Sequence, residues 1–246
     1  MRSVRDDIMG MPIMVEIVGG AEGSLNAVFE HFKAVDMRFS TYKKESEISQ
    51  INRKERTEEE YSRNMKEVFA LAKRTKEETG GFFSIERPDG TIDPSGIVKG
   101  WSILNAAQLV ESLGYKHYFI DVAGDIQSRG EDPEGRPWTI GIRNPFEEKE
   151  IVKVIIPRGC GVATSGTSVR GQHIYDPHEP GSTIDDIASI TVIGPNIYDA
   201  DRFATAAFAM GEKGVAFIEQ LPGFEAYQID RQKRATMTSG FKQFTL

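Results

Sequence analysis

Hydrophobic residues in the first half of the chain recur at the three- and four-residue spacing of an α-helix. The first apolar stripe consists of Leu25, Val28, Phe29, Phe32 and Val35. Residues at this spacing share one helix face, so the segment is predicted to pack that face against the core. Ser24 is predicted to cap this helix, because its hydroxyl can accept a free backbone N–H of the first turn.

Further helices are predicted where the same spacing returns. A second buried face consists of Met65, Val68, Phe69 and Ala72, between the charged residues 53–64 and Gly80-Gly81. A third helix is expected over residues 97–113, with Gly114 as its left-handed cap. Later helices are expected over Asp201–Met210, broken at Gly211, and over Gly214–Leu221.

Segments of β-branched and aromatic residues between glycines and prolines predict strands. These segments are Pro12–Val18, Tyr118–Val122, Trp138–Arg143, Lys153–Ile156, Ala188–Ile193 and Ala226–Ile229. In the third of them, Trp138, Ile140 and Ile142 alternate with Thr139, Gly141 and Arg143. Such alternation is typical of a strand with one buried face.

The order of these elements predicts an α+β fold, in which mixed, largely antiparallel sheets carry packed helices on one side. The chain has 246 residues and shows no long linker, internal repeat or low-complexity tract. Residues 1–246 are therefore expected to form a single domain.

Composition narrows the function classes. Thirty basic against 37 acidic residues give a net charge of −7, which argues against nucleic acid or an anionic membrane as the main partner, although a local basic patch could hold a phosphate. No apolar run reaches the length of a membrane-spanning helix, and residues 1–10 do not resemble a signal peptide. Cys160 is the only cysteine, which excludes an intrachain disulfide and thiolate metal clusters. A cytoplasmic enzyme or binding protein without a membrane anchor is expected.

Common nucleotide and hydrolase motifs are absent. The chain has no G-x-G-x-x-G after a strand, no G-x-x-x-x-G-K-[ST], no H-E-x-x-H and no G-x-S-x-G. Any chemistry must therefore come from less familiar arrangements, and four polar clusters are candidates.

The first cluster, Asp93–Gly100, lies at a predicted helix start. Free N–H groups and the positive end of the helix dipole would favour a phosphate there, and Lys99 adds a full charge. On spacing alone, the simpler interpretation is an Asp93 cap and a surface lysine.

The second cluster, residues 163–171, combines four hydroxyl side chains, two glycines and Arg170. Backbone N–H groups, hydroxyls such as that of Ser165, and the guanidinium could together bind an anion. An exposed turn explains the same composition equally well.

The third cluster, residues 173–178, contains a histidine and a carboxylate three residues apart. His173 and Asp176 could converge on one substrate proton, because histidine titrates near neutral pH. Taken alone, His173 more simply satisfies a nearby backbone group, and His178 is expected to be an ordinary surface residue.

The fourth cluster, residues 199–205, places Asp201 and Thr205 four residues apart at the start of a predicted helix. They would share one helix face, and their oxygens suit Mg²⁺ better than a soft metal. The alternative is capping by Asp199, with Asp201 interacting favourably with the helix dipole.

Taken in order, these clusters resemble the ApbE family of flavin transferases (FAD:protein FMN transferases). The matching stretches are Met9-Gly10, residues 39–42 and 46–52, Gly80–Phe83, Asp93–Gly100, Asp121–Ile126, Ala163–Gly166, Arg170, His173–Pro177 and Ala200–Gly211. Single motifs of this kind are weak evidence, but a collinear set that covers most of the chain is specific.

The resemblance implies binding of FAD and Mg²⁺, transfer of FMN from FAD to a Ser or Thr hydroxyl of an unidentified acceptor protein, and release of AMP. It implies that Asp201, Thr205 and the Gly96 carbonyl hold the metal, and that His173 assists catalysis. The implied flavin-nucleotide contacts are Met9, Tyr42, Phe82, Phe83, Ser84, Asp93, Lys99 and Tyr175. Such chemistry would suit His173 or Asp176 as the proton acceptor and Lys99 or Arg170 as phosphate partners.

The chain departs from the family pattern at several positions. The usual M-G-T is Met9-Gly10-Met11, and the usual G-A-F-D-x-T is replaced by residues 81–86, G-F-F-S-I-E. The stretch between Gly81 and Asp93 is also shorter than usual. These differences bear on the adenine side of the site. They leave two alternatives open, hydrolysis of the FAD pyrophosphate to FMN and AMP, and flavin binding without catalysis.

Overall fold

The computed structural model describes residues 1–166, 174–179 and 181–246. Eight strands in these residues form one sheet in the order β1-β2-β3-β4-β7-β8-β9-β10. Their bounds are β1 Arg2–Ile8, β2 Met11–Ile17, β3 Tyr118–Val122, β4 Asp125–Arg129, β7 Gly161–Gly166, β8 Ile187–Gly194, β9 Glu225–Asp230 and β10 Ala235–Met237. Every described pair of neighbouring strands is antiparallel.

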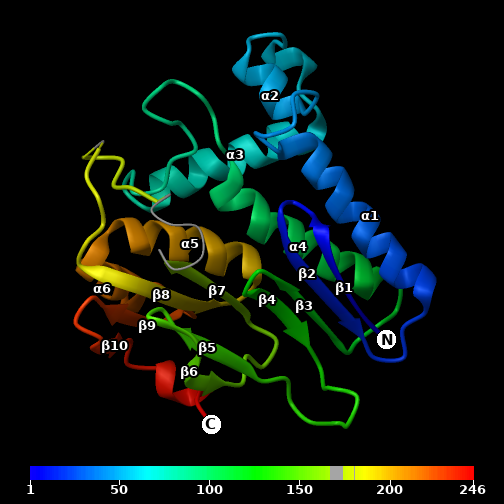
Figure 1. Cartoon of the computed structure of the whole chain (residues 1–246), viewed down its shortest axis with the longest axis vertical. Helices are drawn as coiled ribbons and strands as arrows, with labels where there is room; N and C mark the ends of the chain where they lie inside the picture. Colours follow the sequence, from blue (N-terminus) through cyan, green and yellow to red (C-terminus); the bar gives the residue numbers. More distant parts are fainter. Residues whose placement is uncertain (167–173, 180) are drawn as a thin grey trace.

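The remaining elements lie on the two faces of this sheet. A separate antiparallel hairpin consists of β5 Ile140–Asn144 and β6 Glu147–Ile155. The α-helices are α1 Glu22–Phe39, α2 Glu47–Asn52, α3 Arg63–Glu78, α4 Ser95–Ser112, α5 Ile197–Ala209 and α6 Gly214–Glu219. Short 3₁₀ turns are η1 Glu58–Glu60, η2 Gly211–Lys213 and η3 Phe241–Phe244. This arrangement confirms the predicted α+β class with largely antiparallel pairing (Figure 1).

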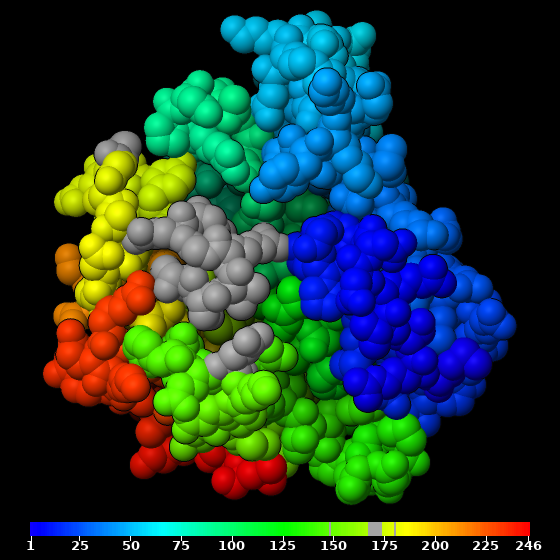
Figure 2. Space-filling view, viewed as in Figure 1, coloured from blue at the N-terminus to red at the C-terminus, as the bar shows by residue number. Residues whose placement is uncertain are grey.

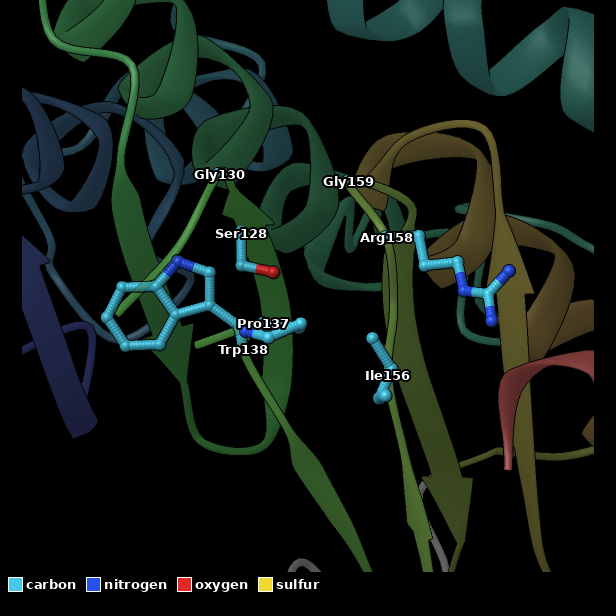
Figure 3. Close-up of a pocket in the computed structure, with 7 residues that line it drawn as sticks. All are labelled: Ser128, Gly130, Pro137, Trp138, Ile156, Arg158 and Gly159. Atoms are coloured by element: carbon cyan, nitrogen blue, oxygen red, sulfur yellow. The ribbon is translucent and has the colours of Figure 1, made fainter. Parts of the chain in front are cut away.

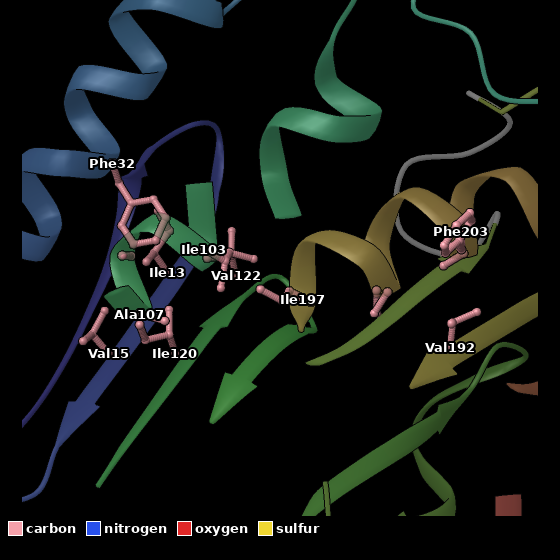
Figure 4. Packing of buried hydrophobic residues seen from close by; sticks show 14 of the residues in the cluster. Ile13, Val15, Phe32, Ile103, Ala107, Ile120, Val122, Val192, Ile197 and Phe203 are labelled. Carbon is pink, nitrogen blue, oxygen red and sulfur yellow. The ribbon is translucent and has the colours of Figure 1, made fainter. Parts of the chain in front are cut away.

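Hydrophobic side chains along the strands point alternately to the two faces of the sheet, so a core forms on each face. Ile120 of β3 packs into the cluster beneath α1, α4 and α5, whereas its neighbour Phe119 packs into the cluster beneath the hairpin. Figure 4 shows Phe32 of α1, Ile103 of α4 and Phe203 of α5 in the helix-side cluster. Successive strand residues point to opposite faces, so one sheet supports both layers.

A third core lies where α1, α2, α3 and the start of α4 meet. Phe39 and Trp101 meet edge to face there, with ring centres 5.6 Å apart, and the Trp101 indole donates to Glu67 at 2.9 Å. The region around α2 projects from the rest of the molecule, as the space-filling view shows (Figure 2). Among the described helices, none combines the length and the apolarity needed to span a lipid bilayer.

Several element boundaries differ from the sequence prediction. The α1 helix begins at Glu22 after Ala21, and the Ser24 hydroxyl hydrogen-bonds the Tyr115 hydroxyl at 3.0 Å, so the predicted Ser24 cap is wrong. The α5 helix begins four residues before Asp201, because the Asn196 side chain accepts the Asp199 N–H at 3.0 Å and caps it. Gly114 has φ +91°, as expected for the left-handed residue that follows α4.

Strands β1, β4, β7 and β10 and the short helix α2 were not predicted. In β1, Arg2, Arg5, Asp6 and Asp7 hide the strand pattern, because an edge strand can expose charged side chains. In β4 and β7, glycines and polar residues such as Asp125, Gln127 and Thr164 interrupt the apolar pattern. Asp125 and Gln127 are nevertheless buried, which no local pattern indicates.

Candidate functional site

The predicted metal ligands lie where α4 and α5 cross. The backbone N–H of Gly100 in α4 donates to Asp201 Oδ2 in α5 at 2.7 Å. A methyl group on Gly100 would lie 2.7 Å from Asp201 Cβ and 2.9 Å from the Ile197 carbonyl oxygen. Only glycine therefore permits this approach of the two helices, which places the Asp201 carboxylate, 3% exposed, inside the interface.

Gly96 and Thr205 lie one helical turn further along the same interface. A Cβ built on Gly96 would lie 3.5 Å from Thr205 Cγ2 and 3.9 Å from Thr205 Oγ1. In a regular helix, the Gly100 N–H would be donated to the Gly96 carbonyl four residues earlier. Asp201 competes for this N–H, which leaves the Gly96 oxygen more capacity to bind a cation. The structure thus brings Gly96, Asp201 and Thr205 together, while their role as metal ligands stays a prediction.

The half-buried Lys99 and the buried Asp125 lie beside Asp201. Lys99 of α4 forms an ion pair with Asp125 Oδ2 of β4, whose side chain is only 1% exposed. The contact lacks hydrogen-bond geometry, and this oxygen has no hydrogen-bond donor among the described residues. Asp125 Oδ1 accepts the Thr164 N–H of β7 at 3.0 Å. Lys99 is therefore part of a buried charge cluster rather than the surface lysine of the simpler interpretation.

Burial controls the protonation of these carboxyl groups. Burial and the neighbouring Asp125 carboxyl together raise the pKa of Asp201 to about 7, against the opposing effects of Lys99 and the Gly100 N–H. Burial likewise raises the pKa of Asp121, against the effect of the Gly124 N–H that its carboxylate accepts at 2.7 Å. A nearby cation would favour the ionised forms of these groups.

The residues present fit a hard divalent cation such as Mg²⁺. Carboxylate, hydroxyl and carbonyl oxygens are the donors that Mg²⁺ prefers, and Asp201, Thr205 and Gly96 supply one of each at the α4–α5 crossing. Within the described ranges, no three His, Cys, Asp or Glu side chains converge to hold a metal by themselves. Mg²⁺ commonly takes its remaining ligands from water and substrate phosphates, which agrees with this small protein set.

The loop between α3 and α4 brings several predicted flavin contacts to the same place. Phe83 is 2% exposed, and its ring edge lies 3.4 Å from a Cβ built on Gly96. The Phe83 N–H donates to Thr79 Oγ1 at 3.1 Å, which fixes the loop on the end of α3. The buried Phe83 ring thus supports the start of α4, while Ser84 Oγ accepts the Glu86 N–H at 3.1 Å.

Residues 174–179 lie against this loop. The Tyr175 hydroxyl donates to the Glu86 carbonyl at 3.1 Å, and burial raises the pKa of Tyr175. His178 Nε2 lies 3.1 Å from the Gly80 carbonyl oxygen, and the His178 ring meets Phe82 edge to face at 4.6 Å between ring centres. His178 is exposed as expected, yet these contacts tie it to the loop.

Other predicted site residues are placed differently. Asp176 Oδ1 accepts the His178 N–H at 2.8 Å. Asp93 forms an ion pair with Arg87 and accepts the Ser95 N–H at 3.0 Å. The N-cap of α4 is Pro94, so the Asp93 cap of the simpler interpretation is wrong. His173 and Arg170 lie outside the described residues.

Three more predicted contacts vary in exposure. Tyr42 is 95% exposed, so its ring has a free face for a ligand. Met9, in the β1–β2 turn with φ +57°, packs against the helix-side core and the core around α2. Ser165 is buried in β7, one residue after Thr164. Their contacts with flavin stay predictions.

A surface hollow at the other end of β4 is not part of this site. It has a volume of about 190 Å³ and is lined by Ser128, Gly130, Pro137, Trp138, Ile156, Arg158 and Gly159. Figure 3 shows the Arg158 guanidinium directed away from Ser128. Ser128 is near the end of β4 opposite Asp125, so the hollow opens away from the charge cluster.

Comparison with known proteins identifies the family. The sequence model of the ApbE family matches residues 9–87 and 84–228. The chain belongs to the ApbE family. An ApbE relative named FAD:protein FMN transferase, from Vibrio cholerae, is 30% identical over 177 residues, 67% of this chain and 53% of that protein. A second relative with this name, from Escherichia coli K12, is 28% identical over 169 residues, which are 64% of this chain and 48% of that protein. The chain thus spans about half the length of these relatives.

Solved ApbE structures share the fold over the whole chain. The flavin transferase ApbE from Vibrio cholerae gives a TM-score of 0.85 at 23% identity and covers 99% of both chains. The ApbE protein from Thermotoga maritima gives 0.86 at 21% identity and covers 100% of both. At these identities the likeness establishes the ApbE fold alone.

Proposed function

We propose that the protein transfers FMN from FAD to a Ser or Thr hydroxyl of an acceptor protein, with Mg²⁺ bound and AMP released. The observation that carries this proposal is the α4–α5 crossing, where Gly96, Asp201 and Thr205 meet beside the ion-paired Lys99. Membership of a family whose relatives are named FAD:protein FMN transferases supports the same reaction.

The site suits a pyrophosphate substrate. Attack on one phosphorus increases the negative charge on its oxygens, and Mg²⁺, when bound, supplies charge neutralisation there. Asp201, Thr205 and the Gly96 carbonyl would hold that ion. Lys99, anchored by Asp125, would place a positive charge near the phosphates, where low dielectric strengthens its effect.

The candidate proton acceptor, Asp176, lies in residues 174–179, next to the loop between α3 and α4. Asp176 is oriented by the His178 N–H on its Oδ1, so Oδ2 would accept the proton of the attacking hydroxyl. His173 is the second candidate for this role. The exposed Tyr42 ring would stack on the flavin or the adenine.

Hydrolysis of FAD to FMN and AMP is the second candidate function. It needs the same contacts to the pyrophosphate and differs only in using water as the acceptor. The short connection between Gly81 and Asp93 supports it, because a shorter wall leaves more room for water. Flavin binding without catalysis is the remaining alternative.

The test uses the whole chain with FAD, Mg²⁺ and a Ser/Thr-containing acceptor domain. Transfer predicts an acceptor mass increased by one FMN, together with AMP, whereas hydrolysis predicts free FMN and AMP without acceptor. Asp201→Ala is expected to abolish either reaction. Glu134→Ala, which removes an exposed ion pair with Arg136, is the control and should react like the wild type. Intact FAD in every reaction would refute both catalytic proposals.

A further inference from the structure

Arg202 follows Asp201 in α5 and is 4% exposed, an unusual place for a guanidinium. It forms ion pairs with Asp199 on its own helix, at 2.8 Å, and with Glu78 at the end of α3. Its Nη1 lies 3.4 Å from Thr75 Oγ1, and its guanidinium stacks 3.9 Å from the Phe203 ring centre. A buried arginine with this many partners holds α3 and α5 in one fixed relation.

Arg202 and Arg74 balance the charges of two neighbouring carboxylates, Glu78 and Asp199. Burial raises the pKa of Glu78, but hydrogen bonds from Arg202 and Arg74 outweigh this effect and lower it overall. The Glu78 carboxylate therefore stays ionised at neutral pH and stays paired. Removing Arg202 would leave Glu78 and Asp199 close together without the cation between them.

A continuous series of buried contacts leads from Arg202 to the flavin loop. Thr75, a partner of Arg202, is fully buried, and its carbonyl accepts the Thr79 hydroxyl at 2.7 Å. Thr79 Oγ1 in turn accepts the Phe83 N–H at 3.1 Å. The Phe83 ring packs on Gly96, which lies beside Thr205 on the helix that carries Arg202.

We propose that Arg202 is a positioning residue, which sets the place of loop 79–84 relative to Asp201 and Thr205. Arg202 does not touch the reacting atoms in this account; it acts through Thr75, Glu78 and Thr79. The inference rests on the proposed function for its consequence, since loop 79–84 would contact FAD and Asp201 would hold the metal.

This role predicts that loss of Arg202 raises the dissociation constant for FAD but leaves that for Mg²⁺ nearly unchanged. Loss of Arg202 displaces the loop, so affinity for FAD falls, whereas the Asp201–Gly100 contact between α4 and α5 keeps Mg²⁺ affinity near the wild-type value. A general loss of structure would weaken both. A loss of FAD affinity without a loss of Mg²⁺ affinity thus distinguishes positioning of the loop from a merely structural role.

The experiment compares Arg202→Met, Arg202→Lys and Thr79→Val in the full chain. Thr79→Val removes the hydroxyl that accepts the Phe83 N–H and donates to the Thr75 carbonyl, and it leaves every charge in place, so it carries the test if Arg202→Met fails to fold. Arg234→Met is the matched control, because Arg234 forms an exposed ion pair with Asp230, away from the site.

Two readouts are measured, hydrogen–deuterium exchange of peptide 79–84 and dissociation constants for FAD and Mg²⁺. We expect about tenfold faster exchange and about tenfold weaker FAD binding for Arg202→Met, smaller effects for Arg202→Lys and Thr79→Val, and Mg²⁺ affinity within twofold throughout. Arg234→Met should match the wild type.

The inference is overturned if hydrogen–deuterium exchange in peptide 79–84 is the same in the folded variants as in the wild type. It is also overturned if FAD and Mg²⁺ binding weaken to the same degree. If the wild type binds no FAD, the proposed function fails, while the exchange measurement still decides whether Arg202 positions the loop.

Discussion

Replacement of Gly100 by alanine tests the geometry of the α4–α5 crossing. The new methyl group would lie 2.7 Å from Asp201 Cβ and 2.9 Å from both Asp201 Oδ2 and the Ile197 carbonyl. These distances are roughly 1 Å shorter than ordinary carbon contacts of about 3.5–4.0 Å. Because the Ile197 carbonyl belongs to the backbone, rotating one side chain does not relieve the overlap, and α5 must shift.

The magnitude follows from two opposing effects. Overpacking in a core costs about 1–3 kcal/mol, whereas replacing a helix glycine by alanine recovers about 1 kcal/mol. The overlap with the Ile197 backbone puts the overpacking cost in the upper part of this range, about 2–3 kcal/mol. The net loss of about 1–2 kcal/mol lowers the Tm by roughly 2–8 °C for a chain of this size. The shift also moves Asp201 from its place, so Mg²⁺ binding should weaken at least about tenfold, which corresponds to about 1.4 kcal/mol.

Scanning calorimetry and Mg²⁺ titration calorimetry measure both effects. Gly96→Ala is the control within the site, because its Cβ would meet Phe83 at 3.4 Å and Thr205 at 3.5 Å, which are ordinary contacts. It should keep its Tm and its Mg²⁺ affinity. Gly23→Ala, with nothing within 4 Å, is the control outside the site. A Gly100→Ala protein with wild-type Tm and Mg²⁺ affinity would refute the packing argument.

Three further predictions concern the same region. Lys99→Met should destabilise the metal-free protein by about 3 kcal/mol in urea unfolding, because it leaves the buried Asp125 carboxylate without its cation; wild-type stability would contradict the ion pair. Since the pKa of Asp201 is raised from 3.8 to about 7, stability of the metal-free protein should fall as pH rises through this window. The increase in Tm caused by Mg²⁺ should then be larger at pH 8 than at pH 5.5, and an equal increase would count against Asp201 as the ligand. Ala123 has φ +52°, so Ala123→Gly should raise stability by about 0.5–1 kcal/mol, and a lower Tm would argue against strain there.

The α1 helix shows what the sequence predicts well. Its stripe of Leu25, Val28, Phe29, Phe32 and Val35 is buried as expected, because helical periodicity is a local property of the chain. Its first residue was misplaced, since Ser24 is a good cap by residue type but bonds Tyr115, 91 residues away. Periodicity thus identifies a helix, while distant contacts decide how its ends are satisfied.

The site shows the opposite case. The spacing of Asp201 and Thr205 indicates that they share a helix face, and this does not depend on where the helix begins. Nothing in the local sequence indicates that Lys99 pairs with Asp125, or that Arg202 reaches Glu78 across 124 residues. These pairs arise only when α3, α4, α5 and β4 assemble, so they needed the structure.

A crystal structure of the protein with FAD and Mg²⁺ tests the central claim most directly. The account predicts a cation about 2.0–2.2 Å from oxygens of Asp201, Thr205 and Gly96, with its remaining positions filled by pyrophosphate oxygens and water. An FAD bound elsewhere, or a Mg²⁺ ion that does not touch Asp201, would contradict it.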